Sequence, residues 1–487
     1  MISNPIELDK FLREIRERHT PQNISPNPFF YLVKPTQENL EKYHLRGDSS
    51  SFRLTLDLVL FIPLLIHYQV KSVAISIVRL KESNKFRPEN LKKTKKLVIS
   101  HFTYAQKAST EDVFFGHNVN DDETFVFYLN STRNQAQDIC DRYVEAGRKN
   151  QIINTKSLKI LKMLQLHLFQ NKLMFSLIGI ALSESNLSTY QRRLLIRGAL
   201  WQHHRATVAN LVLRERLLSV ISQIQPSKLI LTIEGHSHEF MILEARKLKF
   251  KNVKVVGVQH APIVAGQFSF FELLNHFSKI DILLTSGIAT QRQISDRSPN
   301  LDIRVLGSPK SLKIEPVIDF SSKRHVLGAV EGVSQSLESF IALFNDLAFH
   351  IPQKNFVLRL HPALDGHVVK ALMKKLDRLE NLSISKESLS VDLANSAVVI
   401  FRSSAVGIEG LAYSALPMHF DPSGEGLLNP LLDLGLGPDV FTTAEELATY
   451  LKQASNQDIP IPSDQKKLFT LFNEYYSPLK DINQLID

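Results

Sequence analysis

The sequence predicts an α/β protein of two domains, each built on a parallel sheet. The chain has 487 residues, which is too long for one ordinary hydrophobic core. Its second half alternates short apolar runs with helical patterns, and this alternation implies right-handed crossovers between parallel strands. The Pro-containing stretch Gly307–Phe320 lacks periodicity and separates two such series. We therefore expect an N-terminal domain over residues 1–310 and a C-terminal domain over residues 311–487.

Composition indicates a globular protein of a reducing compartment. The hydrophobic fraction is 44% and the charged fraction 22%. The single cysteine, Cys140, excludes an internal disulfide framework. Residues 1–20 show no apolar signal segment, so we expect a cytoplasmic protein. The longest apolar run, Leu54–Ile66, contains Asp57 and is shorter than the roughly 20 residues that span a bilayer, so we predict a core segment.

The net charge of +9 favours anionic partners, which include nucleotides, phosphorylated lipids, membrane surfaces and nucleic acid. Zinc-finger spacing, an RNP-like strand and an Arg-rich tail are all missing, so we expect no nucleic-acid partner. A long helical pattern over Tyr190–Ile224 carries six arginines between its apolar residues. Those arginines form either a solvated basic face or a surface that meets an anionic acceptor or the inner face of a membrane.

Short strands are expected in the first 150 residues, among them Ser72–Val78 and Phe125–Leu129. One or two helices follow over Leu158–Leu182. From residue 229 onwards, apolar runs of strand length alternate with a helix over Ser237–Lys249. The predicted strands of this series are Leu229–Ile233, Val253–Val258, Ile280–Thr285 and Ile303–Leu306.

The second series has the same character. Its predicted strands are His325–Val330, Asn355–Leu360, Ala397–Phe401 and Leu416–Phe420. Its predicted helices are one that ends at His350, one that ends with Val391–Asn395, and Val406–Tyr413. The last residues, Gln465–Asp487, are helical in pattern and polar enough to pack back across the other domain.

Polar residues follow four of these strands, and ligands of open parallel sheets bind beyond the carboxyl ends of the strands. In the first domain they are Glu234-Gly235 and Gln259-His260, and in the second they are His361-Pro362 and Ser403-Ser404. Two half-sites that face each other across a cleft suit a transferase with a donor and an acceptor.

The half-site of the first domain centres on Glu234. This carboxylate is placed either to act as a general base or only to stabilise the dipole of the helix that follows. Glu239 is either its partner or an ordinary helix residue, and His260 either donates to a ligand anion or is structural. A metal site built from His236, His238, Glu239 and His260 has no support from any further ligand-rich motif, so we expect no metal.

The half-site of the second domain has two strand ends. At the first, Arg359 and His361 bring a cation and an imidazole together, and Pro362 stops the strand. At the second, Ser403 and Ser404 open a helix, where hydroxyls and free N–H groups either hold a phosphate or simply cap the helix.

Three further residues of the second domain are candidates for donor binding. Gly332 and Ser334 lie in a strand-to-helix turn that suits a second phosphate contact. Glu409 lies one turn into the helix after Ser404, where it either accepts from ribose hydroxyls or faces solvent.

The combination of Ile233-Glu234-Gly235, His361-Pro362 and Ser403-Ser404 resembles the acidic-Gly, HP and SS motifs of bacterial GT-B sialyltransferases. Glu234–Glu239 followed by Val255–His260 is similar to bacterial surface-carbohydrate biosynthesis transferases. The resemblance covers roughly residues 229–422. It implies a fold of two Rossmann-like domains that face each other across a cleft, with a C-terminal helix that crosses back.

The resemblance also implies a chemistry. The donor is a CMP-activated acidic sugar, such as sialic, pseudaminic or legionaminic acid or Kdo, and the acceptor is a surface glycan or glycolipid. In that family the residue matching Glu234 is the base, the one matching His361 contacts the CMP phosphate, and those matching Ser403 and Ser404 hold it. No cofactor or metal is implied.

The sequence departs from the family pattern at Ile233, where sialyltransferases often carry a second acid. This leaves open a retaining mechanism in which a carboxylate attacks the sugar directly. Two other functions also stay open: a CDP-polyol phosphotransferase of the teichoic-acid type, and a non-catalytic nucleotide-binding scaffold.

Overall fold

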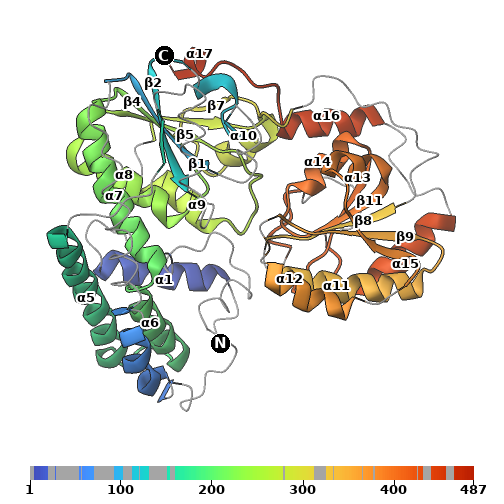
Figure 1. The fold of residues 1–487 in the computed structure, drawn as a ribbon, viewed down its shortest axis with the longest axis horizontal. Helices are drawn as coiled ribbons and strands as arrows, with labels where there is room; N and C mark the ends of the chain where they lie inside the picture. Colours follow the sequence, from blue (N-terminus) through green and yellow to red (C-terminus); the bar gives the residue numbers. More distant parts are fainter. Residues whose placement is uncertain are drawn as a thin grey trace.

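The protein is described by a computed structural model that covers part of the chain. The described residues are 5–19, 28, 54–55, 57–67, 69–70, 93–102, 112–119, 121–130, 151–153, 160–277, 280–311, 325–332, 334–362, 364, 366–376, 379–424, 426–431, 440–456 and 465–486. They form two parallel sheets with helices packed on them, one in each half of the chain (Figure 1). The predicted strand at residues 72–78 lies outside the described residues, as do Cys140 and residues 312–320 of the predicted linker.

The first sheet has seven strands in the order β3-β2-β1-β4-β5-β6-β7, and every pair is parallel. The four strands predicted after residue 228 are confirmed to within two residues at either end. β2 confirms the strand predicted at 125–129, whereas β1 and β3 were not predicted. The strand bounds are β1 Lys96–Phe102, β2 Thr124–Asn130, β3 Gln151–Ile153, β4 Lys228–Thr232, β5 Lys254–Val258, β6 Ile282–Thr285 and β7 Ile303–Val305.

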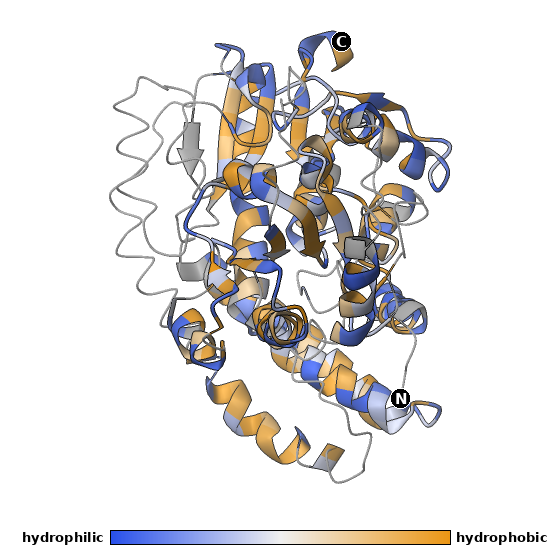
Figure 2. Cartoon of the chain, turned by 90° about the vertical axis from the view of Figure 1, so that its right-hand side faces the viewer, coloured by the Kyte–Doolittle hydropathy of each residue, from blue (hydrophilic) through white to orange (hydrophobic). Residues whose placement is uncertain are grey.

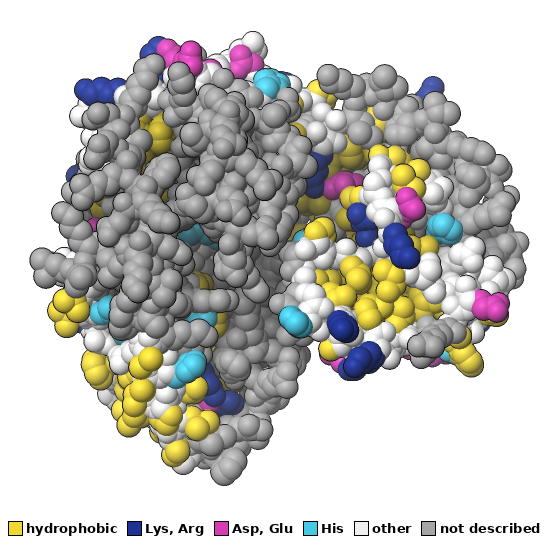
Figure 3. All heavy atoms as spheres, viewed as in Figure 1, with side chains coloured by type: hydrophobic (Ala, Val, Ile, Leu, Met, Phe, Trp, Pro, Cys, Tyr) yellow, Lys and Arg dark blue, Asp and Glu magenta, His cyan; other side chains and the backbone are white. Residues whose placement is uncertain are grey.

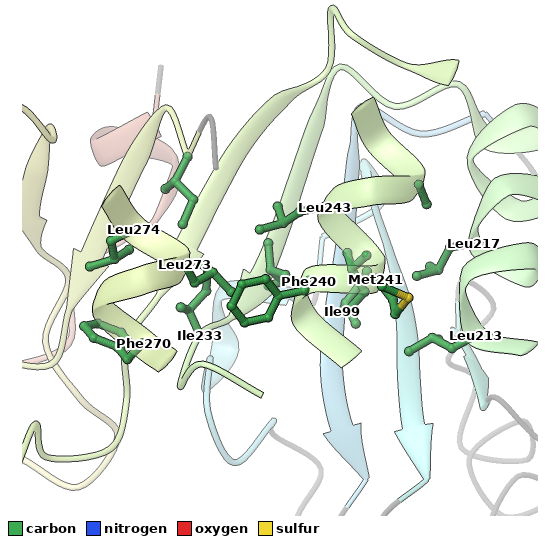
Figure 4. Close-up of a cluster of buried hydrophobic side chains, with 14 of the residues drawn as sticks. Ile99, Leu213, Leu217, Ile233, Phe240, Met241, Leu243, Phe270, Leu273 and Leu274 are labelled. Carbon is green, nitrogen blue, oxygen red and sulfur yellow. The ribbon is translucent and has the colours of Figure 1, made fainter. Parts of the chain in front are cut away.

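Helices cover this sheet, and α1, α5 and α6 form a helical unit below it in Figure 1. The main core lies where α8 packs between the sheet and α7, with Phe240 and Met241 of α8 among its most buried side chains (Figure 4). The helix bounds are α1 Pro5–His19, η4 His117–Val119, α5 Ile160–Ser183, α6 Thr189–Trp201, α7 Arg205–Ile224, α8 Ser237–Lys249, α9 Phe268–Glu272, η5 Leu273–Phe277 and α10 Ile288–Ser295.

The long helix predicted over residues 190–224 is in fact two helices. α6 ends at Trp201, and His204 adopts an extended ψ of 145° as the N-cap of α7, where its side chain accepts from the amide of Ala206. The apolar period continues through this break because both helices bury a face against the same core. Periodicity alone therefore could not reveal the corner.

The arginines of α6 are neither a solvated face nor a free basic surface. The Nε atom of Arg193 lies 2.8 Å from the Oδ2 atom of Asp57, and Arg197 pairs with the other oxygen of that carboxylate. Arg192 donates to two backbone carbonyls at the end of α5. Both interpretations are therefore wrong for these residues, because the charges are used inside the domain.

The apolar segment predicted to be core is a helix over the described residues 57–67, and only one face of it is buried. Phe61 and Leu65 pack on the main core, and Asp57 is 3% exposed. Val59 and Ile62, by contrast, are 66% and 65% exposed. The core prediction is thus wrong for half of this helix. Among the described residues, no helix is both long and apolar enough to cross a membrane.

The second sheet has five parallel strands in the order β10-β9-β8-β11-β12. Its four predicted strands are confirmed, and β10 is an additional edge strand. The bounds are β8 His325–Ala329, α11 Ser334–His350, β9 Asn355–Arg359, α12 Gly366–Leu372, η7 Met373–Lys375, β10 Leu382–Ile384, α13 Leu389–Asn395, β11 Ser396–Phe401, α14 Val406–Ala412, β12 Leu416–His419 and α15 Ala444–Asn456.

The C-terminal segment crosses back to the first domain, as predicted. α16, Gln465–Tyr475, packs on the second domain, and α17, Asn483–Ile486, lies against the first (Figure 1). The amide of Ile482 donates to the Oδ1 atom of Asn118 at 2.9 Å. Two Rossmann-like domains and a returning C-terminal segment confirm the predicted GT-B architecture.

The connection between the domains is a pair of packed segments. Gly307 has a φ of +93°, and a Cβ atom there would lie 2.2 Å from the carbonyl oxygen of Pro478. The amide of Ser308 donates to the carbonyl of Ser477 at 2.9 Å. The predicted boundary after residue 310 falls between the two sheets, and the outgoing and returning chains touch each other there.

Candidate active site

Glu234 lies between the carboxyl end of β4 and the start of α8, at the edge of the sheet where the strand-end rule placed it. The tight turn there depends on Gly235, which has a φ of +87°. A Cβ atom on Gly235 would lie 2.3 Å from the backbone nitrogen of Phe270. Only glycine satisfies both the backbone angle and this close approach of α9.

Glu239 holds the backbone of this turn. Its carboxylate accepts from the amides of Glu234 at 2.9 and 3.0 Å, of Gly235 at 2.7 Å and of His236 at 3.1 Å. The side chain is 1% exposed, and burial raises its pKa to about 7 despite these donors. Of the two alternatives for Glu239, the structure therefore shows a partner of Glu234, acting through the backbone.

The carboxylate of Glu234 lies between two imidazoles. Its Oε1 atom is 2.8 Å from the Nε2 atom of His260, and its Oε2 atom is 3.1 Å from the Nε2 atom of His236. Burial alone would raise the pKa of Glu234, but His260 and His236 more than offset it and hold the pKa well below its usual range. With 24% of its side chain exposed, Glu234 is an ionised group that a ligand can reach.

A ring of aromatic side chains surrounds this carboxylate. His238 packs edge-on against His101 and stacks on His236, with ring centroids 5.2 and 5.4 Å apart. Phe114 packs edge-on against His260 at 4.4 Å. Burial lowers the pKa of His101 to about 4 and also lowers the pKa of His238. Both are therefore neutral at pH 7, and Glu234 is the charged centre of the cluster.

His101 was not identified from the sequence, although a signal existed. It stands next to last in β1, at the same carboxyl edge as Glu234 and His260. The strand-end rule would have selected it had β1 been recognised. Among the described residues, no three or more His, Cys, Asp or Glu side chains are grouped so that they could hold a metal ion.

The half-site of the second domain is built differently. The amide of Ser403 donates to the Oε1 atom of Glu331 at 2.5 Å, and the hydroxyl of Ser404 accepts from the amide of Val406 at 3.3 Å. His361 and Pro362 are exposed just beyond β9. The N-cap of α14 is Ala405, which makes no side-chain cap hydrogen bond, so neither serine is the N-cap and Ser404 accepts from the first helical amide from one residue further back. The phosphate-binding role of these residues stays a prediction.

The structure also places three other residues that were predicted to bind the donor. Arg359 donates to the Oδ2 atom of Asp392 at 2.6 Å and to a backbone carbonyl at 2.8 Å, so its guanidinium ties β9 to α13. Gly332 is exposed after β8, and Ser334 is the first residue of α11. Their roles toward a donor also stay predictions.

Three buried polar residues near Ser403 were not predicted from the sequence: Arg402, His419 and Asp421. His419 is 2% exposed and packs edge-on against Phe401, with ring centroids 5.6 Å apart. Burial lowers the pKa of His419 to about 4. Arg402 approaches Asp421 at 3.8 Å. Phe401 and His419 are the last residues of β11 and β12, and Arg402 and Asp421 come after these strands at the carboxyl edge of the second sheet.

Lys310 connects the two half-sites electrostatically. Its Nζ atom is 2.7 Å from the Oε1 atom of Glu409 and 5.5 Å from the ring centroid of Tyr476. Burial would lower the pKa of Lys310, but Tyr476, Glu409 and Glu234 raise it. Lys310 thus contacts Glu409 of the second domain and lies within electrostatic range of Glu234 in the first.

A backbone hydrogen bond joins loops of the two domains beside this site. The amide of Gly266, which follows β5 by eight residues, donates to the carbonyl of Leu427 at 3.0 Å. Gln267 next to it donates to the carbonyl of Glu234 at 3.2 Å. The turn that carries Glu234 is therefore linked to the second domain through two successive residues.

No protein family matches this chain. No curated protein matches it either. Among solved structures, it is similar to the glycosyltransferase SnogD from Streptomyces nogalater, with a TM-score of 0.47 and 12% identity over 81% of this chain and 99% of that one. A S. aureus TarM variant in complex with UDP gives a TM-score of 0.45 at 11% identity, covering 79% and 97% of the two chains. The UDP-GlcNAc 2-epimerase from Neisseria meningitidis gives 0.42 at 10% identity, covering 78% and 96%.

Proposed function

We propose that this protein is a glycosyltransferase that moves an acidic sugar from a CMP donor to a hydroxyl of a surface glycan or glycolipid. The observation that carries the proposal is the carboxylate of Glu234, ionised between His260 and His236 at the carboxyl edge of the first sheet. The motif resemblance to bacterial sialyltransferases supports the choice of donor.

In this proposal Glu234 is the general base. It takes the proton of the acceptor hydroxyl as the oxygen bonds to the anomeric carbon, and the bond from that carbon to the phosphate of CMP breaks with its electron pair on the phosphate. The hydrogen bonds that Glu239 accepts hold the turn in place before substrate arrives, so little reorganisation is needed during reaction. His260 orients the carboxylate and is also near enough to meet a ligand anion.

The second domain supplies the donor site. His361, Ser403 and Ser404 are proposed to contact the phosphate of CMP, and Glu409 the ribose hydroxyls. Gly332 and Ser334 provide a further phosphate contact, while Arg359 and Pro362 position the strand end that carries His361. Lys310 places a positive charge beside Glu409, where it offsets charge that develops on the departing phosphate.

The first test is thermal unfolding of the purified protein with CMP, CDP, UDP, GDP or ADP, because a ligand that binds only the folded state raises its stability. We expect a shift with CMP that is lost in His361→Ala and kept in His367→Ala, which removes an exposed imidazole of α12 in the same domain. A shift with UDP or GDP alone would mean that the donor carries that nucleotide and not CMP. No shift with any nucleotide would favour a non-catalytic scaffold.

The second test separates sugar transfer from phosphotransfer. A CMP-sugar labelled in the sugar and at phosphorus is incubated with candidate acceptors. We expect the sugar label alone to reach the acceptor, with the phosphorus label recovered in CMP. Transfer of the phosphorus label would instead identify a phosphotransferase.

A further inference from the structure

An exposed apolar stripe runs along α5. Leu164, Leu168, Phe175 and Leu182 are 55%, 69%, 64% and 62% exposed, and their spacing places them on one face of the helix. At 1.5 Å per residue the stripe is about 27 Å long. The other exposed residues between them are Gln165, Lys172 and Gly179. A solvent-facing helix surface is normally polar, so this face is unusual.

The helix at residues 57–67 carries a second such face. Leu58, Val59, Ile62 and Ile66 are between 41% and 66% exposed. The Asp57 ion pairs fix this helix on α6, and α6 in turn packs along α5. Both apolar faces therefore belong to the helical unit at the lower end of the first domain in Figure 1.

Exposed large apolar side chains are concentrated here. Val70, three residues after the 57–67 helix, is 63% exposed as well, and elsewhere in the described part of the chain the exposed large apolar residues are the isolated Ile288, Phe349 and Val391. Figure 3 shows hydrophobic side chains gathered at the lower end of the molecule, over the region of α5, α6 and the 57–67 helix. In Figure 2 the helices at the end where the N-terminus lies carry long hydrophobic stretches. Patches of this kind mark interaction sites.

The charges on these two helices identify the partner. α5 contains no acidic residue, and Asp57, the acidic residue of the 57–67 helix, is buried in its ion pairs with α6. The exposed charge within the stripe of α5 is the cation Lys172. Apolar rows with a basic residue among them fit helices that lie in the plane of an anionic bilayer, where lysine extends its ammonium group to the headgroups.

The position of the active site agrees with this partner. The Nδ2 atom of Asn210, in the first turns of α7 next to the helical unit, donates to the hydroxyl of Ser237 at 2.8 Å. Ser237 begins α8, three residues after Glu234. The helical unit therefore adjoins the carboxyl edge of the first sheet, and a bilayer beneath it would lie on the side of Glu234.

We propose that the apolar faces of α5 and of residues 57–67 form a docking surface for an anionic lipid bilayer. Their side chains enter the boundary between headgroups and acyl chains, and the protein lies on the membrane. This inference rests on the exposure, the charge and the position of the helical unit, and it does not depend on the proposed sugar transfer.

Co-sedimentation with lipid vesicles tests the docking surface. Vesicles of phosphatidylcholine with or without phosphatidylglycerol are mixed with the full chain, with Phe175→Glu, with Ile62→Glu, and with Phe349→Glu. The last variant is the matched control, since Phe349 is 72% exposed in the other domain. We expect the native chain and Phe349→Glu to sediment with anionic vesicles, and the other two variants to bind at least about tenfold more weakly.

Lys172→Gln separates the electrostatic contribution from the apolar one. It should weaken binding to anionic vesicles and leave binding to neutral vesicles unchanged. Circular dichroism verifies folding, and Leu168→Ser replaces any glutamate variant that fails to fold.

Two results would overturn the proposal. One is a native chain that stays in solution with both kinds of vesicle, or equal sedimentation of all variants. The other is a native chain that forms a dimer by light scattering and ignores vesicles, with the dimer lost in Phe175→Glu. That result would assign the face to a second copy of the chain.

Discussion

The two domains share one architecture but prepare their carboxyl edges in different ways. In the first domain, Glu234 is held by two imidazoles at its carboxylate and by Glu239 at its amide. These contacts all come from the same domain. In the second domain, Glu409 takes its cation from the linker residue Lys310, and His361 is exposed.

The two domains therefore differ in which part of the chain orients their carboxylates. A group that acts on a developing charge is most effective when it is oriented before the reaction. Glu234 in the first domain is oriented in this way. In the second domain, the cation beside Glu409 comes instead from the linker residue Lys310, so its position depends on how the two domains meet.

The largest effect is expected from Glu234→Gln. The amide keeps the size of the side chain but removes the charge and the proton acceptor, so kcat should fall by roughly 10²- to 10⁴-fold. The thermal shift with CMP should remain, because the proposed donor site lies in the other domain. Turnover within about threefold of native would remove Glu234 as the base.

Gly235→Ala should disrupt the same turn through the backbone. The added Cβ meets Phe270 at 2.3 Å in a backbone conformation with a φ of +87°, so we expect a loss of about 3 kcal/mol in unfolding free energy. Gly179→Ala is the matched control, because a Cβ there meets nothing within 4 Å. In helix α5 that change should stabilise by about 0.5 to 1 kcal/mol. Equal effects of the two changes in urea unfolding would contradict this account of the turn.

The second domain is expected to respond to pH through His419. Burial lowers the pKa of His419 to about 4, so between there and 6.5 the unfolded chain binds a proton that the folded chain does not. Stability should therefore be lost as the pH falls through this window, by about 1.4 kcal/mol per pH unit at most. His419→Gln should flatten the plot of unfolding free energy against pH, and His367→Gln should leave it unchanged. A plot of equal slope in His419→Gln would refute the assignment.

The smallest effect is expected at the linker. Lys310→Met removes the ion pair with Glu409, and because the lysine side chain is 48% exposed we expect at most about 1 kcal/mol, or about fivefold in CMP affinity. Lys370→Met, an exposed lysine of α12, should change nothing. Titration calorimetry measures both. An unchanged affinity in Lys310→Met would mean that Lys310 only joins the domains.

The sequence alone predicts those helices and strands whose local residue pattern is clear. The predicted strands after residue 228 and the helix α8 were found because buried parallel strands are short apolar runs bounded by polar turns. The same logic found Glu234 and His260, since both follow such runs directly. It did not find β1, and hence missed His101.

Which distant residues lie close together is visible only in the tertiary structure. His101, Glu234 and Lys310 are far apart in the chain and come together because adjacent parallel strands end at one edge and the linker passes beside it. Likewise the arginines of α6 are an internal ion-pair network, while the apolar stripe of α5 is exposed. Local pattern specifies how a segment can bury its apolar face, but which segment covers it depends on contacts between distant parts of the chain.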